Sequence, residues 1–183
     1  MLPPSPWIVR WSHLLQTGCS VLDVACGSGR HVQWFAGRGH VVLGIDKDIE
    51  QAASLQTAAS LVQADIESKA WPLLDNGLPQ QFGAVVVTNY LWRPLLPTLA
   101  QSLLPGGVLL YETFAMGNET VGKPSRPDFL LQPGELLKCF SQLHVVAYEC
   151  GAMENPRRFV QRIAAVRTDE FSALAEAQSG HSL

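Results

Sequence analysis

Short apolar runs alternate with segments of helical periodicity along most of the chain, and this alternation restricts the fold more than any other feature. Five runs are expected to be strands: residues 20–25, 40–46, 61–65, 82–89 and 108–114. Helices are expected between them, at 30–38, from Asp48 onward, after Asn89 with a bend near Pro97, and at 133–140. Strands separated in this way by helices form a parallel sheet that is covered on both faces.

Two further strands, 144–149 and 159–167, are joined by a connection too short for a helix and are expected to pair antiparallel. The predicted fold is therefore α/β, with a doubly wound, mostly parallel seven-stranded sheet and a C-terminal antiparallel hairpin. Residues 1–168 are expected to form one domain, with 1–19 as a covering segment, 115–132 as a substrate loop and 169–183 as a loose tail.

Composition narrows the class of function. The chain has 183 residues, 47% of them hydrophobic, and a net charge of -3, so no basic stripe for a nucleic acid is expected. The four cysteines form no CxxC pair and the histidines lack metal-ligand spacing, which predicts no metal site. The N-terminus lacks the basic region and apolar run of a signal peptide, and no apolar run approaches the length of a membrane span, so we expect neither. We expect a cytoplasmic protein that is a monomer or a weak homodimer.

The segment VLDVACGSGR joins the first strand to the first helix. Gly27 and Gly29 allow a ligand to approach the backbone, and the following helix begins with free N–H groups. A dinucleotide loop would have a third glycine where Val32 stands. Asp23 would repel a pyrophosphate, whereas it can accept a hydrogen bond from the ammonium of an amino-acid ligand. The loop therefore favours S-adenosylmethionine over a dinucleotide.

Acidic residues end the next two strands. Asp46 can accept both hydroxyls of a ribose, a feature that nucleotides share with S-adenosylmethionine. Asp65 can accept from an adenine amino group while Ile66 packs on the ring, although Asp65 is also suited to cap a helix.

The run VLDVACGSGRH, followed by GID, QAD and LLPGG, resembles the class I S-adenosylmethionine-dependent methyltransferase family. It looks most similar to the small bacterial enzymes grouped with tellurite-resistance and thiol methyltransferases. The motifs extend from about residue 20 to 114, and Ala25 stands where the family commonly has glycine. The resemblance implies S-adenosylmethionine as cofactor and S-adenosylhomocysteine as product. The cofactor site is then expected to comprise Asp23, Ala25, Cys26, Gly27, Gly29, Asp46, Lys47, Asp65, Ile66 and Thr88.

The acceptor is expected beyond the fourth predicted strand, where polarity changes abruptly. Asn89, Arg93, Asn118 and Phe129 are candidate substrate contacts, the last two because the segment 115–132 is unusually long for a simple connection. Arg93 could instead pack a helix against a loop. Tyr90, His31 and Glu112 are candidate catalytic bases, and their spacing favours none of them.

The predicted reaction is transfer of a methyl group to a small molecule by in-line displacement, with catalysis mainly by alignment. Thiolates and chalcogen oxyanions would need little proton abstraction. Three alternatives stay open: an NAD-dependent oxidoreductase, a non-catalytic S-adenosylmethionine-binding protein, and an RNA or protein methyltransferase that works with a partner.

Overall fold

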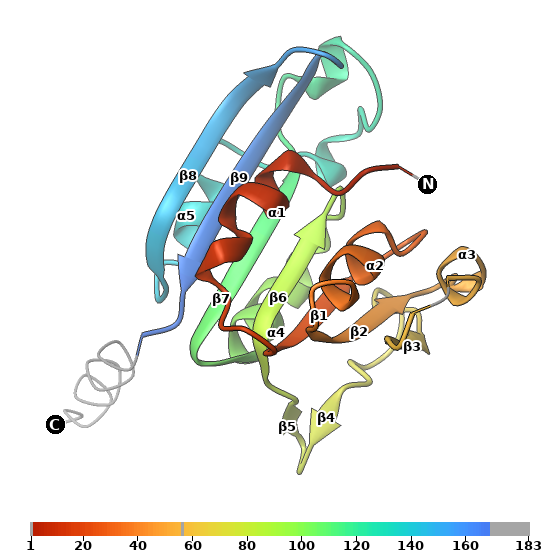
Figure 1. Ribbon diagram of the computed structural model, residues 1–183. Helices are drawn as coiled ribbons and strands as arrows, with labels where there is room; N and C mark the ends of the chain where they lie inside the picture. The colour runs from red at the N-terminus through yellow and green to blue at the C-terminus, as the bar shows by residue number, and fades with distance from the viewer. Residues whose placement is uncertain (1, 56, 169–183) are drawn as a thin grey trace, which may run out of the picture.

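The computed structural model describes residues 2–55 and 57–168, and the predicted tail at 169–183 lies outside this range. One seven-stranded sheet dominates the fold (Figure 1), with the strand order β3-β2-β1-β6-β7-β9-β8. Its strands are β1 Ser20–Val24, β2 Val41–Asp46, β3 Ser60–Gln63, β6 Phe82–Thr88, β7 Leu103–Phe114, β8 His144–Met153 and β9 Arg158–Val166.

The strand directions follow from the lengths of the connections. Neighbouring strands pair parallel from β3 to β7, whereas β9 pairs antiparallel with both β7 and β8. This arrangement confirms the predicted fold class. The β8–β9 hairpin is longer than expected, because its ladder continues to the pair Met153 and Arg158.

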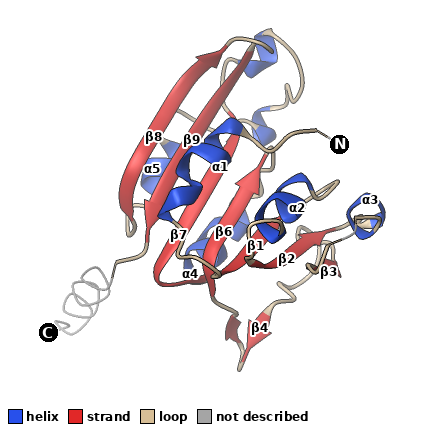
Figure 2. Ribbon diagram, viewed as in Figure 1, coloured by secondary structure: helices blue, strands red, loops and turns tan. Residues whose placement is uncertain are grey.

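Helices cover both faces of the sheet (Figure 2), with α1 and α2 on one side and α4 and α5 on the other. The α-helices are α1 Pro6–Trp11, α2 Arg30–Ala36, α3 Glu50–Ala53, α4 Leu96–Gln101 and α5 Glu135–Cys139. Four 3-10 turns accompany them: η1 Ser12–Leu14, η2 Arg93–Leu95, η3 Asn118–Thr120 and η4 Pro127–Phe129. None of the helices in the described part of the chain could cross a membrane.

The central strand β6 is buried on both faces, as its apolar sequence predicts. Val85 and Val87 point into the cluster that contains α4 and α5, while Ala84 and Val86 point into the cluster that contains α1 and α2. A parallel strand in the middle of a doubly wound sheet has this environment because helices exclude water from both sides.

The N-terminal segment is fastened to the sheet. The Ser5 hydroxyl accepts from Trp7 N at 3.2 Å and caps α1, and Pro6 stands at the start of the helix. The buried Trp7 donates its indole N–H to the carbonyl of Ile163 on β9 at 3.3 Å. Residues 5–11 therefore pack across β7 and β9 rather than standing free.

Three local features differ from the sequence-based expectations. A second sheet pairs β4 Leu74–Asp75 with β5 Leu78–Pro79, a hairpin that we did not predict. Helix α3, expected from Asp48 onward, covers only Glu50–Ala53, and Ala52 is its one buried residue. The bend expected near Pro97 is η2 followed by α4, with Pro97 in the first turn of α4, where its missing N–H breaks no helical bond.

Candidate active site

The glycine loop lies at the carboxyl end of β1, and its two glycines serve different purposes. Gly27 has a φ of +53°, and a Cβ there would meet nothing within 4 Å, so space is open above its backbone. Gly29 has a φ of +77°, and a Cβ there would lie 2.7 Å from Leu55 Cδ1 and 3.1 Å from the Ala52 side chain. Gly27 thus leaves room for a ligand, while Gly29 allows α2 to pack against α3.

Asp23 is a buried carboxylate beneath this loop. It is 1% exposed, and its Oδ2 has no hydrogen-bond partner among the described residues. Burial raises the pKa of Asp23 to about 7, although the nearby Arg30 opposes the rise. The side chain can therefore accept a hydrogen bond that the protein itself does not supply.

Asp46 joins the end of β2 to the glycine loop. Its Oδ2 accepts from Gly27 N at 2.8 Å, and its Oδ1 accepts from Asp48 N at 3.0 Å. These two bonds fix the carboxylate at the edge of the adjoining cavity. The orientation of Asp46 is thus set by the backbone on either side of it.

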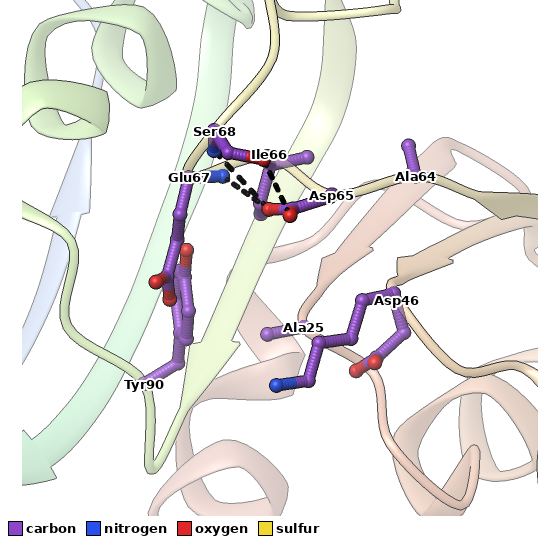
Figure 3. A pocket seen from close by; sticks show the side chains of 9 residues that line it. Ala25, Asp46, Ala64, Asp65, Ile66, Glu67, Ser68 and Tyr90 are labelled. Atoms are coloured by element: carbon purple, nitrogen blue, oxygen red, sulfur yellow. Dashed lines mark hydrogen bonds between the residues drawn. The ribbon is translucent and has the colours of Figure 1, made fainter.

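A cavity of about 290 Å³ opens between the carboxyl ends of β1, β2 and β3 (Figure 3). Ala25, Asp46, Lys47, Asp65, Ile66 and Tyr90 line it, together with Ala64, Glu67 and Ser68. Six of the sequence-predicted residues therefore surround a single cavity.

Asp65 has two roles at this cavity. Its carboxylate accepts from Glu67 N at 3.0 Å and from Ser68 N at 3.2 Å, so it caps the turn that follows β3. Hydrogen bonding to the Ser68 hydroxyl, and then to these two amides, lowers the pKa of Asp65. Asp65 therefore both caps this turn and lines the cavity.

Ala25 and Cys26 contribute through the backbone. Ala25 has a φ of +53°, in the left-handed region that favours glycine, which is the residue common there in the family it resembles. Burial, together with the charges of Asp23 and Asp46, raises the pKa of Cys26 to about 12. The Cys26 thiol therefore stays protonated and is poorly suited to act as a nucleophile.

A second cavity, of about 270 Å³, lies beyond the end of β6. Among its lining residues are the predicted Asn89, Tyr90 and Phe129, and also Glu67, Leu91, Thr113, Phe114 and Pro124, which sequence reasoning missed. Thr113 and Phe114 end β7, so their place at the end of a predicted strand was the available signal. Glu67 and Tyr90 line both cavities, which are therefore neighbours.

Tyr90 is poorly suited to the role of general base. Its hydroxyl is buried without a hydrogen-bond partner in the described residues. Burial, and then the negative charge of Glu67, raise the pKa of the Tyr90 phenol further above its ordinary range. The phenol therefore stays neutral near pH 7 and can act as a donor.

His31 and Glu112 are enclosed by the N-terminal segment, which argues against the catalytic roles that we predicted. His31 is 1% exposed and its Nε2 accepts from Ser5 N at 3.0 Å; burial lowers the pKa of His31 to about 3. Glu112 is equally buried and accepts from the Ser5 hydroxyl at 3.0 Å and from Arg162 at 3.2 Å. Both side chains use their polar atoms to dock α1.

Arg93 and Asn118 are not among the residues that line the second cavity, and their polar atoms contact the protein instead, so direct substrate contact by either stays a prediction. The Arg93 guanidinium makes four hydrogen bonds, to the carbonyls of Asp128 and Leu130 and to both oxygens of Glu135. The buried Asn118 side chain donates to the Pro124 carbonyl at 2.9 Å and accepts from Phe159 N at 3.2 Å.

Thr88 ends β6 beside the glycine loop. Its hydroxyl lies 3.4 Å from Arg30 Nη2, which makes the hydroxyl an acceptor for the guanidinium. Among the residues that the structure describes, no group of histidine, cysteine and acidic side chains could hold a metal ion.

The part of the chain that matches a known family contains the residues of the site described above. The sequence model of the family described as "Methyltransferase domain" matches residues 21–107, which contain the glycine loop, Asp46 and Asp65. The fold is similar to that of TehB from Haemophilus influenzae, with a TM-score of 0.72 and 19% identity over 90% of this chain and 63% of that chain. At this identity the likeness concerns the fold, which is the doubly wound fold predicted from the sequence.

Two curated relatives are 30% identical to parts of the chain. One is a tRNA U34 carboxymethyltransferase of Klebsiella pneumoniae, matched over 61% of this chain. The other is a malonyl-[acyl-carrier protein] O-methyltransferase of Hamiltonella defensa, matched over 54% of this chain. The matches span 37% and 39% of the relatives' own lengths. The strand order, the glycine loop and these matches together make the chain similar to class I S-adenosylmethionine-dependent methyltransferases, with the match to the family model confined to residues 21–107.

Proposed function

We propose that this protein transfers a methyl group from S-adenosylmethionine to a small-molecule acceptor. The observation that carries the proposal is Oδ2 of Asp23, which is buried near the end of the strand that leads into the glycine loop and has no hydrogen-bond partner among the described residues. A buried carboxylate oxygen without a donor is unfavourable, and the ammonium of an amino-acid ligand would supply that donor.

The residues around the first cavity suit the remaining parts of the cofactor. Asp46 is held by Gly27 N and Asp48 N in a position to accept from ribose hydroxyls, and Ile66 offers an apolar surface for adenine. When bound, S-adenosylmethionine supplies a methyl group on a positively charged sulfur. The protein's own contribution is then to align the acceptor and to exclude water, because the methyl group is already activated.

The alternatives fit the site less well. A dinucleotide would bring its pyrophosphate close to the buried Asp23. A protein that only binds S-adenosylmethionine has no need of the second cavity, which adjoins the first through Glu67 and Tyr90. The names of the curated relatives suggest a tRNA or an acyl-carrier protein as acceptor. The matches to these relatives cover less than two fifths of the relatives' lengths.

Binding of the cofactor is tested by calorimetry with S-adenosylmethionine, S-adenosylhomocysteine and NAD. We expect the first two to bind and Asp46→Asn to weaken both roughly 10- to 100-fold, since a hydrogen bond to a charged group contributes about 1.5–3 kcal/mol. Asp75→Asn, a matched change in the exposed β4–β5 hairpin, should leave both affinities unchanged. Binding of NAD alone would contradict the proposal.

Catalysis is tested separately, by release of S-adenosylhomocysteine in the presence of small-molecule acceptors, a tRNA mixture or acyl-carrier protein. Turnover with a small molecule supports the proposal. Turnover with a macromolecule alone would correct the acceptor class, and binding without turnover on any acceptor would favour the non-catalytic alternative.

A further inference from the structure

The second cavity combines residues from three separate parts of the chain. Asn89, Tyr90 and Leu91 follow β6, Thr113 and Phe114 end β7, and Pro124 and Phe129 come from the segment 115–132; Glu67 is its eighth lining residue. It lies at the carboxyl edge of the sheet, where ligands of doubly wound folds bind.

The wall contributed by the segment 115–132 is fixed in place. Arg93 donates to the carbonyls of Asp128, at 2.7 Å, and Leu130, at 2.9 Å, the residues directly before and after Phe129. Asn118 donates to the carbonyl of Pro124. Each of the two loop residues that line the cavity is therefore held by a polar side chain whose other contacts lie in the body of the protein. The cavity is preformed, and binding does not require a loop to become ordered.

The lining is mostly apolar and its charge is negative. Leu91, Phe114, Pro124 and Phe129 offer carbon surface, and the Tyr90 phenol adds no charge near pH 7, since its pKa is raised from a value that already keeps it neutral. Glu67 is the one charged residue among the eight lining residues. Asp46 and Asp65 add negative charge to the adjoining cavity, where Lys47 is the one basic lining residue.

We propose, on the basis of the function proposed above, that the acceptor is a compact ring compound that is uncharged or cationic, and not an oxyanion or a thiolate. An engineered apolar cavity of about 150 Å³ holds benzene, so about 270 Å³ accommodates one ring with substituents or two fused rings. Negative charge at Glu67 repels an anion and attracts a cation or an N–H donor. The charge of the lining therefore disfavours thiolates and chalcogen oxyanions, the acceptors that need little proton abstraction.

A neutral acceptor supplies the attacking lone pair itself. A lone pair on the acceptor's nitrogen, oxygen or sulfur forms the new bond to the methyl carbon, and the carbon–sulfur bond breaks with its electron pair remaining on sulfur. The hydrogen on the acceptor atom leaves as a proton, which Glu67 or water takes up.

The test uses the wild-type protein saturated with S-adenosylhomocysteine and three probes that share a phenyl ring: benzyl alcohol, benzylamine and benzoate, with selenite as an inorganic anion. We expect calorimetry to show benzyl alcohol and benzylamine binding at least about tenfold more tightly than benzoate or selenite. Stronger binding of benzoate or selenite would overturn the proposal, as would failure of all four probes to bind.

Variants of the lining residues test whether the probes bind in the second cavity. Phe129→Ala should weaken benzyl alcohol roughly 3- to 10-fold, whereas Val121→Ala, a change at a similarly exposed apolar residue of the same segment, should not. Glu67→Gln should weaken benzylamine more than benzyl alcohol. Equal effects of Phe129→Ala and Val121→Ala would place the ring elsewhere and contradict the proposal. If the wild type does not bind S-adenosylhomocysteine, the proposed function itself is refuted. Failure of the proposed function can therefore be distinguished from failure of the proposed acceptor class.

Discussion

At the scale of single residues, Ala25 shows how backbone conformation explains a motif position. The sequence shows only that alanine stands where similar proteins commonly have glycine. The structure supplies the reason, since Ala25 has a φ of +53° between the buried Val24 and Cys26. A residue with a Cβ pays about 1–2 kcal/mol in this region, and the surrounding fold holds it there.

Ala25→Gly is therefore expected to stabilise the free protein. Relief of the left-handed strain is partly offset by the greater freedom of glycine in the unfolded chain, leaving a gain of roughly 0.5–1 kcal/mol in the free energy of unfolding. Urea denaturation of the two proteins measures this difference. A loss of stability would mean that the strain at Ala25 is not relieved by glycine.

Asp23 predicts how cofactor affinity depends on pH. The pKa of its carboxyl is raised to about 7 in the folded protein, above its ordinary value near 4, so the free protein binds an extra proton between these values. The free energy of unfolding should consequently fall as pH rises from about 4 to 7. An ammonium ligand needs the ionised form, so affinity for S-adenosylmethionine should rise over the upper part of the same range.

The expected size is about a 20-fold decrease in the dissociation constant between about pH 5.5 and pH 7.5. Calorimetry across this range measures it, and Asp23→Asn should bind more weakly with little dependence on pH. A steep pH profile that persists in Asp23→Asn would assign the titration to another group.

At the scale of elements, side-chain contacts between distant segments decide the shape of the second cavity. The length of the segment 115–132 predicts a binding loop, and its apolar residues predict a lining. Of these, Leu130 and Leu131 enter the core, being 2% and 0% exposed, whereas Phe129 lines the cavity. Sequence spacing could not separate these three neighbours, because their directions depend on the carbonyls that Arg93 holds.

Arg93→Ala should destabilise the protein by about 1–3 kcal/mol, because it leaves two backbone carbonyls without their side-chain donor and leaves the Glu135 carboxylate with the Gln132 N–H but without its ion-pair partner. It should also raise the KM for the acceptor while leaving the affinity for S-adenosylmethionine unchanged. Urea denaturation and steady-state kinetics measure the two effects.

Arg126→Ala is the matched control, since Arg126 forms an ion pair with Asp128 in which both side chains are more than 70% exposed. Its effect on stability should stay within about 0.5 kcal/mol. Similar losses in both variants would mean that Arg93 does not act as an anchor of the loop.

The β4–β5 hairpin is an element that the sequence signalled and that we missed. Asn76 and Gly77 have φ values of +50° and +80°, as a tight two-residue hairpin turn requires, and Asn-Gly is the dipeptide that adopts it most readily. The flanking strands have two residues each and lack an apolar alternation, so only the turn dipeptide could have predicted them.

At the scale of the whole molecule, a ligand that binds only the folded chain should raise its thermal stability. At a concentration 100 times the dissociation constant, S-adenosylhomocysteine contributes about 2.7 kcal/mol. For a chain of 183 residues this corresponds to an increase in Tm of about 5–10 °C. Differential scanning calorimetry measures the shift, and NAD at the same concentration should produce none. Equal shifts with both ligands would show that the site does not discriminate between them.

The sequence by itself determined the seven main strands, the glycine loop and the acids at the ends of β1, β2 and β3. These features are local: hydrophobic periodicity marks the strands, and the carboxyl ends of parallel strands meet at one edge of the sheet. The positions of Asp23, Asp46, Asp65 and Ile66 at one edge of the sheet could be predicted because they follow from the strand ends alone.

Only the tertiary structure decided what surrounds the second cavity. His31, Glu112, Arg93 and Asn118 have side chains that suit catalysis or binding, and each is instead used to join segments that are far apart in the sequence. Whether a polar side chain faces a ligand or another part of the protein depends on partners 26 to 107 residues away. Such contacts follow from the packing of the whole chain, which local periodicity does not encode.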